Sequence, residues 1–112
     1  MSKMQRTKGA AGEREVCSLL SDALGAKVTR QLGQARDSGH DISLPPFRLE
    51  VKRRAHIGNL YEWMRQVQAD PDLCHQTGVI MLRADGEGWL AVMRIEDWIR
   101  LAREEIVDGR TA

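Results

Sequence analysis

Apolar residues recur at three- and four-residue spacing in three stretches of the chain, a pattern typical of helices with one buried face. The first stretch predicts a helix over residues 10–24, followed by Gly25 as a stop signal. The second predicts a helix over residues 60–69, which ends at residues 70–72 because Pro71 cannot extend it. The third predicts a helix over residues 96–106, followed by a frayed tail.

Shorter apolar and β-branched stretches, bounded by turn-forming residues, predict five strands. These strands cover residues 27–32, 41–44, 47–53, 77–82 and 89–95. A Pro45-Pro46 turn separates the second strand from the third, and a glycine-bearing turn at residues 84–88 joins the last two as a hairpin. The predicted order is helix, three strands, helix, two strands, helix. This order predicts an α/β fold with a mixed central sheet flanked by helices.

The chain of 112 residues is long enough for one domain with a real core, and we assign residues 1–112 to a single domain. No apolar run approaches the ~20 residues needed to span a bilayer, and the polar N-terminus lacks the apolar region of a signal peptide. A soluble, cytoplasmic protein is therefore expected. Cys17 and Cys74 have no metal-ligand spacing and are expected to be small buried residues.

Charge is distributed unevenly along the chain, although the formal net charge is only +1. Residues 1–58 carry 11 Lys and Arg against 6 Asp and Glu, whereas residues 59–112 carry 6 against 10. A basic surface on one side of a domain is an electrostatic footprint for polyanions. A mixed charged surface is also normal for a soluble domain, so charge alone leaves both interpretations open.

The stretch from Asp41 to Lys52 combines an acidic residue, the Pro45-Pro46 turn and a strand that carries Glu50 and Lys52. Alternate residues of a strand share a face, so Glu50 and Lys52 should point to one side of the sheet. If the turn folds the first strand back beside the second, two carboxylates and one ammonium converge. Such a cluster is suited to a hard cation bound by oxygen ligands.

A Glu-x-Lys pair is a weak signal by itself, and a salt pair on an exposed strand is the plainer alternative, worth ~1 kcal/mol or less. The context strengthens the signal, because an acid opens the preceding strand and Glu13 lies on an upstream helix. For Glu13 alone, the simpler interpretation is an acidic residue stabilised by the helix N-terminus. The loop over residues 33–40 feeds Asp41, and its Arg36 and His40, with Arg30 just before it, are candidates for phosphate or metal contacts.

Several of these residues together resemble the PD-(D/E)xK nuclease superfamily. The resemblance rests on Lys-Gly-Ala-Ala-Gly-Glu-Arg-Glu at residues 8–15, Arg30, Ser-Gly-His-Asp ending at Asp41, and Glu-Val-Lys at residues 50–52. The start of the chain is similar to archaeal Holliday junction resolvases and to small phage-encoded endonucleases. His40 stands where the superfamily usually has proline. The resemblance implies a restriction-endonuclease-like core and a protein that acts in the host cytoplasm.

The resemblance also implies roles for individual residues. Asp41, Glu50 and the Val51 carbonyl would bind Mg²⁺, for which Mn²⁺ would substitute, and Lys52 would orient or activate the attacking water. Glu13 would serve as a second or outer metal ligand, and Gln66 and His40 as auxiliary residues. The expected DNA contacts are Lys8, Arg14, Arg30, Arg36, Arg53 and Arg54.

Three functions from different classes follow from these observations. The first is a Mg²⁺-dependent DNA endonuclease that acts as a homodimer, with a Holliday junction or branched-DNA resolvase as its narrower form. The second is a nucleic-acid-binding module on the same fold without cleavage, against which the presence of all four of Glu13, Asp41, Glu50 and Lys52 argues. The third is a structural or partner-binding domain whose central charges form a solvated salt network.

Overall fold

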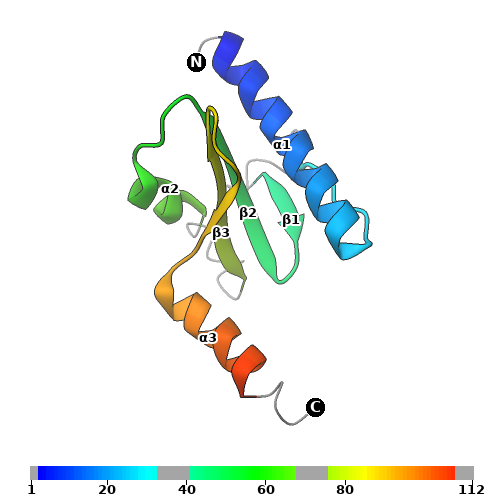
Figure 1. Cartoon of the computed structure of the whole chain (residues 1–112), viewed down its shortest axis with the longest axis vertical. Helices are drawn as coiled ribbons and strands as arrows, with labels where there is room; N and C mark the ends of the chain where they lie inside the picture. Colours follow the sequence, from blue (N-terminus) through cyan, green and yellow to red (C-terminus); the bar gives the residue numbers. More distant parts are fainter. Residues whose placement is uncertain (1–2, 33–40, 68–75, 108–112) are drawn as a thin grey trace.

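A computed structural model describes residues 3–32, 41–67 and 76–107 of the chain, and Figure 1 shows their arrangement around a central sheet. The helices are α1 (Lys3–Leu24), α2 (Leu60–Val67) and α3 (Ile95–Ile106). The strands are β1 (Ile42–Leu44), β2 (Phe47–Arg54), β3 (Thr77–Ala84) and β4 (Leu90–Val92). The α/β fold class is confirmed, with one strand fewer than predicted.

The four strands form one mixed sheet in the order β1-β2-β3-β4. β1 pairs antiparallel with β2 across the cis Pro45-Pro46 turn, as expected for a hairpin. β2 and β3 run parallel over their full lengths, and α2 lies on the connection between them, as a parallel pair requires. β4 returns antiparallel to β3. The two central strands, β2 and β3, therefore hold the middle of the fold.

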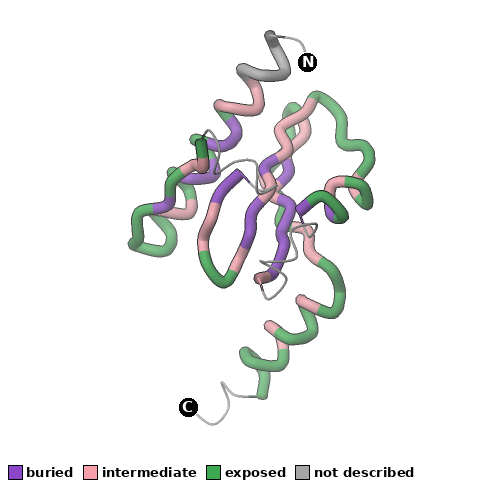
Figure 2. Tube along the Cα trace, turned by 180° about the vertical axis from the view of Figure 1, so that it is seen from behind, coloured by how far each residue is buried: buried purple, intermediate pink, exposed green. Residues whose placement is uncertain are grey.

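The core is divided between the two faces of the sheet, because side chains along β2 and β3 alternate in direction. Figure 2 shows the buried positions concentrated in the sheet and in the parts of α1 and α2 that cover it. On one face, the sheet residues Ile42, Leu49, Val51 and Val79 pack against Val16 and Cys17 of α1. On the other face, Ile80 and Leu82 of β3 pack against Met64 and Val67 of α2.

The first helix begins at Lys3 rather than at residue 10, so Lys8 and Gly9 lie inside it and do not precede it as expected. Gly12 is buried where α1 crosses β2, and a Cβ there would lie 2.8 Å from Cβ of Arg53. Only glycine allows this close approach, which outweighs its unfavourable helix propensity. The predicted end is confirmed, since Gly25 takes a φ of +67° and its N–H donates to Ser21 O at 3.0 Å.

The predicted strand over residues 27–32 is wrong. This segment makes only an isolated bridge between Arg30 and Ile42, and Gln31 N–H donates to Asp41 O at 2.8 Å. Val28 N–H donates to the Ser21 side chain of α1 at 2.9 Å and not to a neighbouring strand. The segment therefore follows the edge of β1 without extending the sheet.

The C-terminal part of the chain departs from the prediction in how it packs. The last strand is shorter than residues 89–95, because Ile95 already belongs to α3. Figure 1 shows α3 pointing away from the sheet, and none of its residues is buried. Trp98, which was expected on a packed apolar face, is 55% exposed. Among the described helices, none has the length and apolar character needed to cross a bilayer.

Some predictions fall on parts of the chain that the structure does not describe. They are the loop over residues 33–40, with Arg36 and His40, the end of the second helix at residues 70–72, Cys74 and the C-terminal tail. Cys17 is buried as predicted, and burial raises the pKa of its thiol.

Candidate active site

Asp41 lies immediately before β1, at the edge of the sheet, with its side chain turned toward β2. Its N–H donates to Leu49 O at 2.9 Å, and its Oδ2 accepts a hydrogen bond of 2.7 Å from Val51 N–H. The residue is buried. The backbone and the carboxylate of Asp41 thus extend the hydrogen bonding between the two hairpin strands by one residue beyond β1. These bonds hold Asp41 beside the Glu50–Lys52 segment, as the sequence predicted.

The Val51 carbonyl faces the same edge of β2 as the Asp41 carboxylate. The N–H and C=O of one strand residue point to the same side of the strand, and Val51 N–H points to Asp41. β1 pairs with β2 only from Phe47 to Leu49, so Val51 lies past the end of this pairing. This geometry is compatible with the predicted role of the carbonyl as a metal ligand.

Glu50 and Lys52 share the face of β2 that is covered by α2, as the strand alternation predicted. Lys52 Nζ lies 3.2 Å from Glu50 Oε1, and the two side chains are only 12% and 13% exposed. The alternative of a salt pair on an exposed strand therefore does not hold. A shielded ion pair gains more from its Coulomb attraction than an exposed one but also costs desolvation, so the pair is weak evidence for added stability.

Trp63 of α2, a residue within the helix predicted over residues 60–69, lies against the ammonium of Lys52. Lys52 Nζ lies 5.3 Å from the centre of the Trp63 ring, and the Arg54 guanidinium lies 5.9 Å from it. Cations at this distance are attracted to the face of an indole ring. Trp63 therefore restricts the direction of the Lys52 ammonium. The sequence did offer a sign of this contact: a tryptophan on the predicted helix that follows the strand carrying Lys52.

Arg48 is a second residue near this site that was not predicted from the sequence. It precedes Glu50 by two positions on the same face of β2 and is only 1% exposed. Its Nε and Nη1 atoms are buried and have no hydrogen-bond partner in the described structure. A buried guanidinium next to Glu50 on one strand face places further positive charge on the side of the site opposite Lys52.

Glu13 is buried in the middle of α1, with only 2% of its surface exposed. Arg30 Nε donates to Glu13 Oε2 at 2.8 Å. Because α1 begins at Lys3, Glu13 is far from the helix N-terminus, and the interpretation that the helix dipole stabilises it is wrong. Arg30 also bridges to Ile42, so the ion pair connects α1 with the edge of β1, next to Asp41.

The donors at this edge fit a small, hard divalent ion. Asp41 and Glu50 offer carboxylate oxygens and Val51 a carbonyl oxygen, and Mg²⁺ needs only one or two carboxylates because it keeps several waters. Within the described residues, no three His, Cys, Asp or Glu side chains gather into a metal-binding group, so Glu13 does not join Asp41 and Glu50 in one set of ligands.

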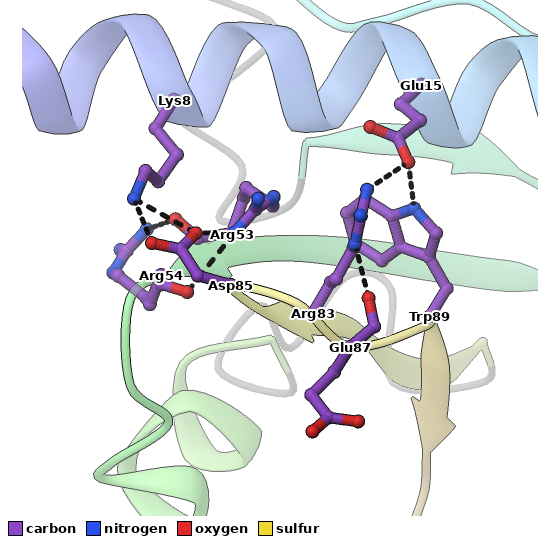
Figure 3. A network of polar contacts seen from close by, with 8 residues as sticks. All are labelled: Lys8, Glu15, Arg53, Arg54, Arg83, Asp85, Glu87 and Trp89. Carbon is purple, nitrogen blue, oxygen red and sulfur yellow. Dashed lines mark hydrogen bonds and ion pairs between the residues drawn. The ribbon is translucent and has the colours of Figure 1, made fainter.

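Two of the predicted DNA contacts, Lys8 and Arg53, meet at one carboxylate outside this cluster, as Figure 3 shows. Asp85, in the turn after β3, accepts from Lys8 Nζ at 3.0 and 3.1 Å and from Arg53 Nη1 at 2.5 Å. These hydrogen bonds lower the pKa of the Asp85 carboxyl. Their stabilising effect is therefore complete above the ordinary aspartate pKa of about 3.9 and is lost as the pH falls through the lowered value.

A second polar cluster joins α1 to the same end of the sheet. Glu15 Oε1 accepts hydrogen bonds of 2.7 Å from Arg83 Nη1 and from Trp89 Nε1 (Figure 3). Arg14, another predicted DNA contact, is exposed on α1, and Gln66, predicted as an auxiliary residue, is exposed on α2. Arg54 is half-buried beside Trp63, and Arg36 and His40 lie outside the described residues.

Comparison with known proteins gives one match. Residues 4–108 match the model of a family described as phage putative PDDEXK endonuclease. No curated protein and no solved structure matches the chain. Apart from Lys3, the first residue of α1, the matched range includes the whole of every helix and strand described above.

Proposed function

The chain belongs to the family of phage putative PDDEXK endonucleases, and from this premise we propose that it is a Mg²⁺-dependent endonuclease that hydrolyses DNA phosphodiester bonds. The main observation that supports the proposal is the position of Asp41. Its carboxylate is held on Val51 N–H, directly beside the shielded Glu50–Lys52 pair. Asp41 thus lies beside a run of three consecutive β2 residues that supply a second acid, a backbone carbonyl and a lysine.

The residue types suit phosphodiester hydrolysis. Mg²⁺ held by Asp41, Glu50 and the Val51 carbonyl would neutralise charge on the phosphate and lower the pKa of a bound water. Lys52 presents a compact ammonium with three donors, which orients the attacking water. This ammonium lies 5.3 Å from the centre of the Trp63 ring and 3.2 Å from Glu50 Oε1, and both contacts help to position it. We expect products with a 5′-phosphate and a 3′-hydroxyl.

Several basic residues are proposed to bind the DNA backbone. They are Lys8, Arg14, Arg30, Arg53 and Arg54. Arg36, which lies outside the described residues, is proposed for the same role. Glu13, through its ion pair with Arg30, is proposed as an outer residue of the site, and Gln66 and His40 as auxiliary ones. Branched DNA such as a Holliday junction is the narrower substrate that we propose.

A cleavage assay tests the proposed function. Purified protein is incubated with labelled linear, nicked and four-way DNA, each with Mg²⁺, with Mn²⁺ and with EDTA. We expect cleavage that requires the metal and is fastest on the four-way junction. A retarded DNA band without cleavage under any metal condition would instead favour a binding module on the same fold, and no interaction with DNA would contradict both.

We also propose that the active form is a homodimer, since cutting both strands of a duplex needs two copies of a single site. Exposed apolar side chains gather on one stripe of α3, at Ile95, Trp98, Ile99 and Ile106, and Leu90 of β4 is exposed as well. A second copy of the chain would cover this stripe.

The molar mass in solution, measured by sedimentation, tests the dimer. The wild type should sediment as a dimer and Trp98→Gln as a monomer with an unchanged melting temperature. Glu104→Gln is the control, because Glu104 is exposed on the opposite side of α3 and should leave the dimer intact. A monomeric wild type at micromolar concentration would rule the interface out.

A further inference from the structure

Asp85 holds together two cations that are far apart in the sequence. Lys8 comes from α1 and Arg53 from β2, and both donate to the carboxylate of Asp85 in the turn that follows β3 (Figure 3). All three side chains keep part of their surface in solvent, and that of Asp85 is 49% exposed. The cluster is therefore accessible from outside the protein.

The cluster lies at the carboxyl end of the two parallel strands, close to the candidate active site. Asp85 N–H donates to Arg54 O at 3.1 Å, so the turn is attached to the end of β2 that carries Lys52. Lys52, Arg53 and Arg54 are consecutive, which makes this end of the sheet strongly basic. Arg53 points to the α1 side of β2 and Lys52 to the α2 side, so a polyanion bound at the active site would reach Lys8 and Arg53 by passing around the carboxyl end of β2.

The contacts of Asp85 have the geometry with which a protein binds a phosphodiester. One lysine and one arginine share two oxygens of a single negative charge, at distances of 2.5 to 3.1 Å. We propose that Lys8 and Arg53 form a binding site for a backbone phosphate of DNA, that Asp85 occupies this site in the free protein, and that DNA binds by displacing it. This inference rests on the proposed function.

Displacement is feasible because Arg53 is held in place by another part of the fold, whereas the side chain of Asp85 is exposed. The stem of Arg53 lies directly against α1 at Gly12, which fixes it. Asp85 instead sits in an exposed turn next to Gly86, whose φ is +82°. Exposed ion pairs are weak and are screened by salt, so a phosphate can compete with them.

The proposed competition predicts tighter DNA binding when the carboxylate charge is removed. In Asp85→Asn, Lys8 and Arg53 are free for phosphate, and we expect the dissociation constant for duplex DNA to fall about two- to fivefold at low salt. The site then carries one more net positive charge. The plot of the logarithm of the association constant against the logarithm of the salt concentration should therefore steepen by about 0.9. Binding is measured by fluorescence anisotropy in EDTA, so that no cleavage is needed.

Glu87→Gln is the matched control. It removes one negative charge from the same turn, but Glu87 contacts Arg83 through its main-chain carbonyl and its carboxylate points away from the cations (Figure 3). This variant should change the dissociation constant less than twofold. The double variant Lys8→Met, Asp85→Asn should lose the gain, because it removes one of the two ligands of the phosphate.

The outcomes separate this inference from the proposed function. Equal tightening in Asp85→Asn and Glu87→Gln would mean that only the overall charge matters and would overturn the inference. Weaker or unchanged binding in Asp85→Asn would also overturn it, provided that its melting temperature shows a folded protein; Asp85→Ser repeats the measurement if it does not. If the wild type itself does not bind DNA, the proposed function fails as well.

Discussion

Replacing Lys52 by methionine is expected to slow DNA cleavage by about 10²- to 10⁴-fold, the range typical of losing a group that handles a proton of the reaction. DNA binding should change little, since one cation among several is lost. Methionine keeps the unbranched stem that lies along Trp63 and removes only the ammonium, which is 3.2 Å from Glu50. Single-turnover cleavage rates and anisotropy measure the two effects separately.

Two further lysine variants make this test specific. Lys52→Arg keeps the positive charge but replaces a compact ammonium with a planar guanidinium, so it should not restore cleavage. Lys27→Met removes a lysine from an exposed position outside the cluster and should cleave like the wild type. If Lys52→Met cleaves at the rate of the wild type, Lys52 has no part in the chemistry.

The hairpin that holds the site was predictable because it depends on residues close together in the sequence. A Pro-Pro turn between two apolar stretches predicts antiparallel pairing, and the period of two along β2 puts Glu50 and Lys52 on one face. Both features are confirmed by the register, in which Ile42 pairs with Leu49, and by the ion pair between the two side chains. The PD-(D/E)xK resemblance is likewise confirmed by the family match.

Features that depend on contacts distant in sequence were not predictable. Trp63 and Asp85 lie 11 and 33 residues from Lys52, and only the fold brings α2 and the turn after β3 to the end of β2. The segment over residues 27–32 has the composition of a strand, but Ser21 of α1 satisfies the N–H of Val28. Tertiary contacts of this kind override local propensity.

In the middle of β2, the two faces carry different kinds of side chain: apolar ones toward α1 and charged ones toward α2. Leu49 and Val51 pack beneath α1 in the apolar core, whereas Arg48, Glu50 and Lys52 lie on the side of α2. Their partners on β3 on this second side are Gly78, Ile80 and Leu82. A row of charges beside an apolar strand is costly to bury without a function, which is consistent with an active site on this face.

Asp41→Asn is expected to reduce cleavage by roughly 10³-fold or more, because it removes a charged metal ligand worth several kcal/mol to the transition state. The fold should persist, since the amide oxygen can still accept the hydrogen bond from Val51 N–H. Asp41→Ala should lose cleavage equally but also unfold more easily, by about 1–3 kcal/mol, because the buried Val51 N–H then has no acceptor. Denaturant unfolding of the two variants distinguishes the structural role of Asp41 from its chemical one.

Asp41→Asn also tests metal binding without any measurement of activity. A ligand that binds only the folded chain stabilises it by about 2.7 kcal/mol at a concentration of 100 times Kd. Mg²⁺ should therefore raise the melting temperature of the wild type and leave that of Asp41→Asn unchanged. Asp22→Asn, which removes an exposed carboxylate from α1, should respond to Mg²⁺ like the wild type. An equal rise in Asp41→Asn would place the metal away from Asp41 and overturn the assignment of the site.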